Sequence, residues 1–378
     1  MDLLQLLTLL VIAGICGAIA QWIIAFSPGN LLVSIIVGVI GAYLGTALAN
    51  LLRIPNLVPP LVIGNQPFNL LWALLGSLLL LYLLALSLSD AFADPAYLGQ
   101  TLRQAAPVGI AAVGTTLVMI LGCVDLSIGA IISFAAVCCA VLMRGEAERM
   151  PWAIGMTLLL CAAMGAVNGV LVVFNRNSSF ILTLGTAIAI YGLTQMLSGG
   201  TARGVVSPGF RAFFNQRLGD VLPVLGLCFV LLAAVLEWVA RRTRLGRQIY
   251  LIGSNREAAL QAGVPIAAVT LACYVISGLF AGLGGLAVLA RSGVSSTFTG
   301  RGFEFDALAA IVLGGTVFSG GRGTVFGTVV GVLVLFIAFN LVNLLGLDYN
   351  LQLVLKGAII ILASAAYARL GQDRSNVS

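Results

Sequence analysis

Long uncharged runs separated by short polar links extend over the whole chain. Apolar runs of about 17 to 25 residues are long enough to cross a hydrocarbon layer about 30 Å thick. They lack the alternation of apolar and polar positions that a membrane β-barrel requires, so each run predicts a helix. The pattern predicts an all-α integral membrane protein with about 12 transmembrane helices. The predicted spans are residues 4–26, 31–52, 68–88, 105–122, 127–143, 151–174, 179–198, 221–240, 266–290, 305–319, 323–345 and 350–369.

The composition excludes a soluble protein. Hydrophobic residues make up 60% of the 378 positions and charged residues only 8%, and the mean hydropathy is +1.11. A soluble chain of this length could not remove so much apolar surface from water. The first apolar run has neither the basic start nor the cleavage site of a signal peptide, so we expect it to stay as a membrane span.

Several kinds of chemistry lack the residues they need. The sequence has no histidine, and its seven cysteines lie in or beside apolar runs without a C-x-x-C pair. Zinc sites and histidine-based catalysis are therefore not expected, and the cysteines are read as small buried side chains. Lys356 is the only lysine and is followed by Gly357, which excludes a phosphate-binding P-loop. We expect no enzymatic activity, no ATPase site, no cofactor and no metal.

The arginines indicate how the chain sits in the membrane. The net charge of +6 comes from arginines at span ends, which is not the pattern of a nucleic-acid-binding protein. Six of them follow the eighth and the last spans and mark the cytoplasmic side: Arg241, Arg242, Arg244, Arg247, Arg369 and Arg374. Twelve spans then place both termini in the cytoplasm. The 199–220 loop is an exception to this distribution, because it carries three arginines although it is predicted to lie on the outer side of the membrane.

The polar segment 241–265 contains a predicted short helix. Ser254 and Glu257 fit an S-x-x-E capping box, so a helix can begin at Asn255. Gly263 and the proline at position 265 would stop it after about two turns. So short a helix is not stable alone, because nucleation costs more than its few hydrogen bonds return. It is either an ordinary connector packed on its own protein or an element that docks on another one. Caps at both ends and the preceding arginines favour docking.

An acidic residue, Asp125, interrupts the apolar sequence between the fourth and fifth predicted spans. A carboxylate inside a membrane region is costly and is by default a candidate functional group. Asp125 is also well placed to cap a helix beginning at Leu126. Both interpretations, capping and contact with the solute or a proton, stay open, and a broken helix facing a midplane cavity is itself typical of transporters.

The 305–319 span is the shortest predicted one. Glu304 and Asp306 stand at its start, where acidic residues stabilise a helix N-terminus. Its end carries the helix-break motif Gly320, Gly321, Arg322 and Gly323. The glycines allow a sharp turn, and a turn beside an arginine could also hold an anion.

Five motifs resemble those of the inner-membrane permeases of ribose-type ATP-binding-cassette sugar importers. They are G-C-V-D-L-S-I-G-A at 122–130, N-G-V-L at 168–171, F-I-L-T-L-G-T at 180–186, G-R-Q-I-Y-L-I-G-S-N-R-E-A-A-L-Q-A-G at 246–263 and F-E-F-D-A-L-A-A-I-V-L-G-G-T-V-F-S-G-G-R-G-T-V-F-G at 303–327. The resemblance covers about 70–369 and implies a permease domain over 67–372. Cys123 stands where that family usually has glycine, and 175–179 is more polar than usual.

The resemblance also implies an architecture and partners. It implies ten helices in two five-helix halves of opposite topology, a pore formed by a homodimer, separate ABC ATPase subunits and a periplasmic substrate-binding protein. The segment that couples to the ATPase would contain Arg247, Ser254, Asn255, Glu257, Ala258 and Gly263. The residues expected near the pathway are Asp125, Ser127, Asn168, Phe180 and Thr183. Polar side chains in spans can equally bond a neighbouring helix.

A second resemblance concerns the N-terminal part. A-I-A-Q-W-I-I-A at 18–25, S-I-I-V-G-V-I-G-A-Y-L-G at 34–45 and L-L-W-A-L-L-G-S-L-L-L-L-Y-L-L-A-L at 70–86 resemble transglycosylase-associated proteins, a family of small three-span membrane proteins. Residues 1–66 would add a two-span hairpin whose third span, 67–88, is shared with the permease. Asp2 is the only acidic residue in this part, so glycosidase chemistry is excluded.

The sequence thus predicts the permease subunit of a bacterial ATP-driven importer of a monosaccharide or similar small polar solute. It leaves the solute open among sugars, nucleosides and related molecules. Two alternatives stay open: an ion-coupled secondary transporter, which would need titratable groups within the bundle, and a non-transporting envelope scaffold built on the N-terminal unit.

Overall fold

The computed structural model describes residues 61–63, 66–68, 90–174, 178–201, 204–219 and 221–344, with isolated positions in 76–86 and 350–361. The predicted spans 4–26 and 31–52 lie outside the described residues, as do most of 68–88 and 350–369. The N-terminal hairpin therefore stays a prediction, as do the count of 12 helices and the two inverted halves.

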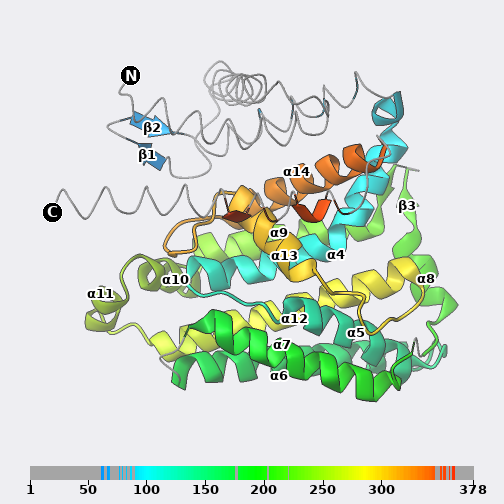
Figure 1. Ribbon diagram of the computed structural model, residues 1–378, viewed down its shortest axis with the longest axis horizontal. Coiled ribbons are helices and arrows are strands. Elements are labelled where there is room, and N and C mark those ends of the chain that lie inside the picture. The colour runs from blue at the N-terminus through cyan, green and yellow to red at the C-terminus, as the bar shows by residue number, and fades with distance from the viewer. Residues whose placement is uncertain are drawn as a thin grey trace.

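Helices dominate the described part of the chain (Figure 1). They are η1 (Asp90–Ala93), α4 (Pro95–Ile120), α5 (Ile128–Met143), α6 (Met150–Phe174), α7 (Ser179–Ser198), α8 (Pro208–Asn215), α9 (Val224–Arg242), α10 (Arg244–Ser254), α11 (Arg256–Gln261), α12 (Ile266–Ser292), α13 (Phe303–Leu313) and α14 (Val325–Leu344). The described part also contains two short antiparallel strand pairs. They are β1 (Leu61–Ile63) with β2 (Gln66–Phe68), and β3 (Arg217–Leu218) with β4 (Leu222–Pro223).

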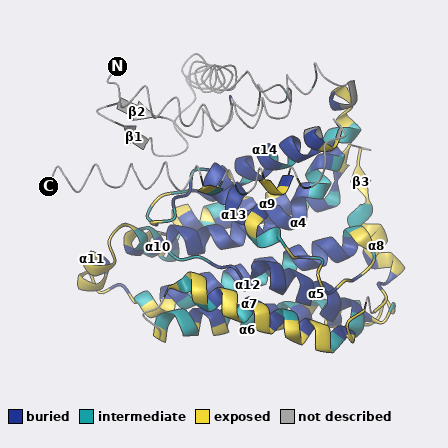
Figure 2. Ribbon diagram, viewed as in Figure 1, coloured by how far each residue is buried: buried dark blue, intermediate teal, exposed yellow. Residues whose placement is uncertain are grey.

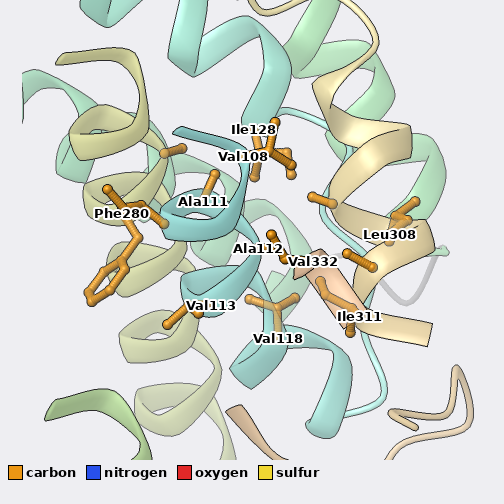
Figure 3. Packing of buried hydrophobic residues seen from close by; sticks show 14 of the residues in the cluster. Val108, Ala111, Ala112, Val113, Val118, Ile128, Phe280, Leu308, Ile311 and Val332 are labelled. Atoms are coloured by element: carbon orange, nitrogen blue, oxygen red, sulfur yellow. The ribbon is translucent and has the colours of Figure 1, made fainter. Parts of the chain in front are cut away.

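The helices α4 and α12 form the centre of the bundle. Figure 3 shows α4 side chains between Phe280 of α12 on one side and Ile311 of α13 and Val332 of α14 on the other. Small residues let these backbones approach closely. A Cβ atom on Gly284 of α12 would lie 2.7 Å from the carbonyl oxygen of Pro107 in α4. Because the central helices pack so tightly, they can carry a displacement from one end of the bundle to the other.

Five helices of the described part are long and apolar enough to cross a membrane: α4, α6, α7, α9 and α12. The most apolar window of α4 is 89% buried, whereas those of α6 and α7 are 28% and 22% buried. The helices α6 and α7 therefore lie at the periphery and present apolar side chains outward (Figure 2). This arrangement agrees with a multi-pass membrane protein.

Two predicted boundaries are wrong. The helix α4 begins at Pro95, well before residue 105, because the side chain of Asp94 caps it by accepting from Ala96 N at 2.8 Å. Proline is favoured at the first helical position, and Pro107 is accommodated inside the helix. The predicted 305–319 span is a short helix as expected, but α13 ends at Leu313 and the chain then runs without helix to α14.

Candidate functional site

The break between α4 and α5 is organised around Asp125, whose side chain is fully buried. Its Oδ1 accepts hydrogen bonds from Ser127 N at 3.0 Å and Ser127 Oγ at 2.6 Å, and its Oδ2 accepts from Ser277 Oγ at 2.8 Å. The prediction that Asp125 caps a helix beginning at Leu126 is wrong in register. The helix α5 begins at Ile128 with Ser127 as its N-cap, and Asp125, two residues before Ser127, forms an Asx turn.

Side chains of other helices satisfy the backbone of the break. Val124 N donates to Ser179 Oγ at 3.0 Å and Leu126 N donates to Thr183 Oγ1 at 3.1 Å. Tyr274 Oη donates to the carbonyl oxygen of Val124 at 3.1 Å. A helix break buried in a membrane region leaves backbone groups that water cannot reach, so these bonds hold the break in one conformation.

Four of the five predicted pathway residues meet at this break. Asn168 Nδ2 donates to Ser127 Oγ at 2.7 Å, which joins α6 to Asp125, and Thr183 joins α7. The side chain of Phe180 does not take part: it carries no polar group, and the residue is 47% exposed in the first turn of α7. We refer to Asp125, Ser127, Asn168, Thr183 and Ser277 as the Asp125 network.

Sequence reasoning missed Ser277 of α12, which supplies the hydrogen bond to Oδ2 and also bonds Thr115 of α4 at 3.1 Å. Ser179 and Tyr274 were missed as well. The available signal was a hydroxyl group in an apolar helix, which is too common to single out one position.

The predicted coupling segment folds into two helices that project from one end of the bundle (Figure 1). The helix α10 was missed because its sequence is polar overall. Its buried residues Gly246, Ile249 and Ile252 nevertheless recur at the three-residue spacing of one helix face. The short predicted helix is confirmed as α11, which begins at Arg256.

The predicted capping box at Ser254 is wrong. Ser254 is the last residue of α10 and so has helical backbone geometry, whereas an N-cap does not. Asn255 is the N-cap of α11, and its Oδ1 accepts from Ala258 N at 3.0 Å. Glu257 lies in the first turn, where a negative charge is favourable.

Gly263 ends α11 as predicted. Its φ of +74° is in the left-handed region that favours glycine. Gly263 N donates to the carbonyl oxygen of Leu260 and Val264 N donates to that of Ala259, both at 3.0 Å. This pair of bonds is a Schellman motif, and it satisfies carbonyl groups that the helix end leaves open.

The coupling segment presents an exposed surface (Figure 2). All six predicted residues are exposed: Arg247, Ser254, Asn255, Glu257, Ala258 and Gly263. Two leucines that the sequence analysis did not single out, Leu251 and Leu260, are 53% and 65% exposed. Both leucines are therefore accessible for contact with another molecule.

The helix-break motif lies against α10 and the end of α4. Gly320, Gly321 and Gly323 have φ values of +81°, +72° and +139°, which explains the glycines. Gly321 N donates to the carbonyl oxygen of Ile120 at 2.8 Å. A Cβ atom on Gly253 of α10 would lie 2.0 Å from that oxygen and 2.5 Å from Gly321 N. Three backbones thus touch, and we call Ile120, Gly253 and Gly320–Gly323 the glycine junction.

Tyr250 adds a side-chain bond to the glycine junction. Its Oη donates to the carbonyl oxygen of Gly323 at 2.8 Å. Burial raises the pKa of Tyr250 to about 12, which further favours the protonated phenol that donates this bond. The binding of an anion by Arg322 and this turn stays a prediction.

Comparison with known proteins places most of the chain in one family. Residues 97–364 match the family described as the permease component of branched-chain amino acid transport systems. The ribose import permease protein of Escherichia coli K12 is 34% identical over 314 residues, covering 80% of this chain and 96% of that protein. The D-allose transport system permease protein of the same organism is 33% identical over 309 residues, covering 80% and 94%.

A third relative comes from Salmonella typhimurium. Its galactose/methyl galactoside import permease protein is 33% identical over 337 residues, covering 81% of this chain and 98% of that protein. No solved structure matches the chain.

Proposed function

Because the chain belongs to the permease-component family of branched-chain amino acid transport systems, we propose that it forms the membrane pathway of an ATP-driven importer. We further propose a monosaccharide, or a small polar solute like one, as its cargo. The observation that carries this choice is that relatives named for ribose, allose and galactose import align over 94–98% of their own length.

Two separate ABC ATPase subunits would drive this transport. The support is the coupling segment, an exposed and capped hairpin at the end of the bundle that the arginines assign to the cytoplasm. Its exposed Leu251 and Leu260 would enter an apolar groove of the ATPase, and Glu257 and Arg247 would set its orientation. A periplasmic binding protein would deliver the solute to the opposite end.

The glycine junction gives the ATPase a route to the break. When α10 moves, Gly253 cannot slide past Ile120, because their backbones are already in contact. The end of α4 must move with it, and Asp125 follows only five residues after Ile120 in the chain. Tightly packed elements shift as units between discrete arrangements, so the motion reaches the Asp125 network.

Within that network we assign different parts to the candidate pathway residues. Asp125 and Ser127 hold the break in place, because the carboxylate is buried and accepts three hydrogen bonds. Asn168 and Thr183 tie it to α6 and α7. Phe180, which is exposed in the first turn of α7, would line the pathway.

We propose that the pathway is completed by a second copy of the chain across the outer face of α7. This face carries Gly185 and Gly192, where an added Cβ would meet no atom within 4 Å, and the exposed Gln195 follows Gly192 by about one turn. Small and polar residues on an apolar helix favour contact with another helix over contact with lipid alone. We also propose that both termini lie in the cytoplasm and that residues 1–66 form an accessory hairpin.

Reconstituted uptake tests the proposed function. The full chain is placed in liposomes with its ATPase and binding protein, and uptake of a panel of monosaccharides is measured with the branched-chain amino acids as competitors. We expect uptake of one sugar that requires ATP and resists amino acid competition. Uptake driven by an ion gradient without the ATPase would establish the secondary-transporter alternative instead. Loss of a partner, with uptake intact, on deletion of 1–66 would show a scaffold role for that part.

A further inference from the structure

A groove of about 410 Å³ lies between α9 and α14, outside the parts already assigned. Both helices reach the end of the bundle from which α10 projects (Figure 1). The groove is lined by Val230, Ala233, Ala234, Glu237, Trp238, Arg241, Arg242, Phe326 and Val329. Aliphatic side chains line its length along Val230 to Ala234 of α9, and the charged residues and Trp238 stand toward the end of α9.

Glu237 of α9 lies in the wall of this groove and links α9 to α14. Its Oε2 accepts from Phe326 N at 3.1 Å, and its Oε1 pairs with the guanidinium group of Arg241. Glu237 thereby caps the start of α14 and fixes the distance between α14 and α9. Both of its oxygens are engaged, and the charges at this end of the groove sum to +1, with Arg241 and Arg242 against Glu237. The start of α14 adds a partial positive charge.

Trp238 marks the depth of the groove in the membrane. Its side chain is 61% exposed, and tryptophan is enriched where hydrocarbon meets the headgroup region. Val230, two turns earlier on α9, is 46% exposed and would lie within the hydrocarbon. The groove thus runs from an apolar depth to a basic, aromatic margin on the side that the arginines assign to the cytoplasm.

We propose that this groove binds one anionic phospholipid of the cytoplasmic leaflet. An acyl chain lies along Val230, Ala234 and Val329, and the phosphate lies at Arg241 and Arg242. Charge complementarity selects this occupant, because basic pockets between membrane helices on the cytoplasmic side attract anionic headgroups. The inference rests on the proposed orientation but not on the identity of the solute.

The position of this lipid gives it a mechanical consequence. Arg242 directly precedes Thr243, whose side-chain oxygen caps α10 by accepting from Gly246 N at 3.2 Å. The headgroup would therefore lie at the joint between α9 and the coupling segment, where it restrains the angle at which α10 leaves the membrane.

Native mass spectrometry of the purified full chain tests the proposal directly. The delipidated protein is mixed with equal amounts of phosphatidylglycerol and phosphatidylcholine, and the lipid retained is measured. We expect preferential retention of phosphatidylglycerol, and an affinity about fivefold lower in Arg242→Gln, since one arginine contributes about that factor near an anionic surface. Ala234→Phe fills the apolar part and should reduce retention of both lipids.

Matched variants keep the outcome specific. Arg217→Gln changes an exposed arginine on β3, and Ala163→Phe enlarges an exposed residue of α6. Both should bind lipid as the unchanged protein does.

Equal retention of the two lipids, or retention unaffected by Arg242→Gln and Ala234→Phe, would overturn the proposal. Weakened association with the ATPase or with a second copy, with lipid retention unchanged, would show that the groove is a protein interface and also overturn it. Because no ATP or solute is present, failure here is distinct from failure of the proposed function.

Discussion

The backbone N–H of Gly321 donates to the carbonyl oxygen of Ile120 at 2.8 Å, across 201 positions of sequence. Ile120 ends α4, and Gly321 lies in the turn before α14, so this bond fixes two parts of the bundle to each other. Gly253 of α10 packs on the same two atoms. The contact among these three backbones therefore joins the coupling segment to α4 and to the break that contains Asp125.

Gly253→Ala should uncouple ATP hydrolysis from transport. The added methyl group would meet the Ile120 oxygen at 2.0 Å, and because both neighbours are backbone atoms the contact cannot be relieved by a side chain. Overpacking of this kind costs about 1–3 kcal/mol, so α10 must shift. We expect uptake in proteoliposomes to fall about tenfold or more while the ATPase stays bound and active.

Gly155→Ala is the control for this substitution, because a Cβ atom at Gly155 of α6 would meet nothing within 4 Å. It should transport normally. If Gly253→Ala transports as well as Gly155→Ala, the glycine junction does not carry the motion.

Asn255→Ala and Ser254→Ala distinguish the observed cap of α11 from the one that its sequence predicts. Only Asn255 accepts from Ala258 N, and loss of an N-cap costs about 1 kcal/mol. We expect Asn255→Ala to weaken ATPase binding about fivefold in a titration and Ser254→Ala to leave it unchanged. Weaker ATPase binding in Ser254→Ala, with binding unchanged in Asn255→Ala, would instead identify Ser254 as the cap.

Asp125→Asn should destabilise the protein. The carboxylate accepts three hydrogen bonds in a site without exposure. An amide nitrogen in place of Oδ2 would bring two N–H donors to Ser277 Oγ, and this hydroxyl can turn to accept only one of them, so a buried donor is left unsatisfied. An unsatisfied buried group costs about 1–3 kcal/mol, so the Tm of the purified protein should drop by several degrees. Glu146→Gln, which removes only an exposed ion pair with Arg149, should leave Tm nearly unchanged. An unchanged Tm with altered solute affinity in Asp125→Asn would instead identify direct contact with the solute.

Gly185→Trp should separate the two copies of the permease. It places a large side chain on the outer face of α7, which we propose as the contact between copies, whereas Gly155→Trp makes the same change on the outer face of α6. Size-exclusion chromatography with light scattering should show monomers for the first variant and dimers for the second. Dimers in both would move the contact away from α7.

The sequence predicted those elements whose signals are local. Both ends of the predicted span 179–198 agree with α7, because polar residues precede Ser179 and two glycines follow Ser198 in the sequence. Asp125 was found because a lone carboxylate stands out in an apolar sequence.

Features that depend on tertiary contact could not be predicted. The helix α10 owes its formation to the packing of Gly246, Ile249 and Ile252, and its polar sequence hides that face. The meeting of Gly253, Ile120 and Gly321 leaves no trace in their spacing, because the three lie far apart in the chain. Ser277 is likewise ordinary until α12 brings it to Asp125.

The proposed function depends most on the coupling segment, which would receive the force of a separate ATPase. Leu260 of α11 is 65% exposed, so Leu260→Asp should alter its surface without affecting the fold. The most direct measurement is co-purification of the ATPase with the full chain carrying Leu260→Asp, alongside its Tm. We predict that the ATPase is lost while Tm is retained. An ATPase that stays bound, and still drives uptake, would contradict the account.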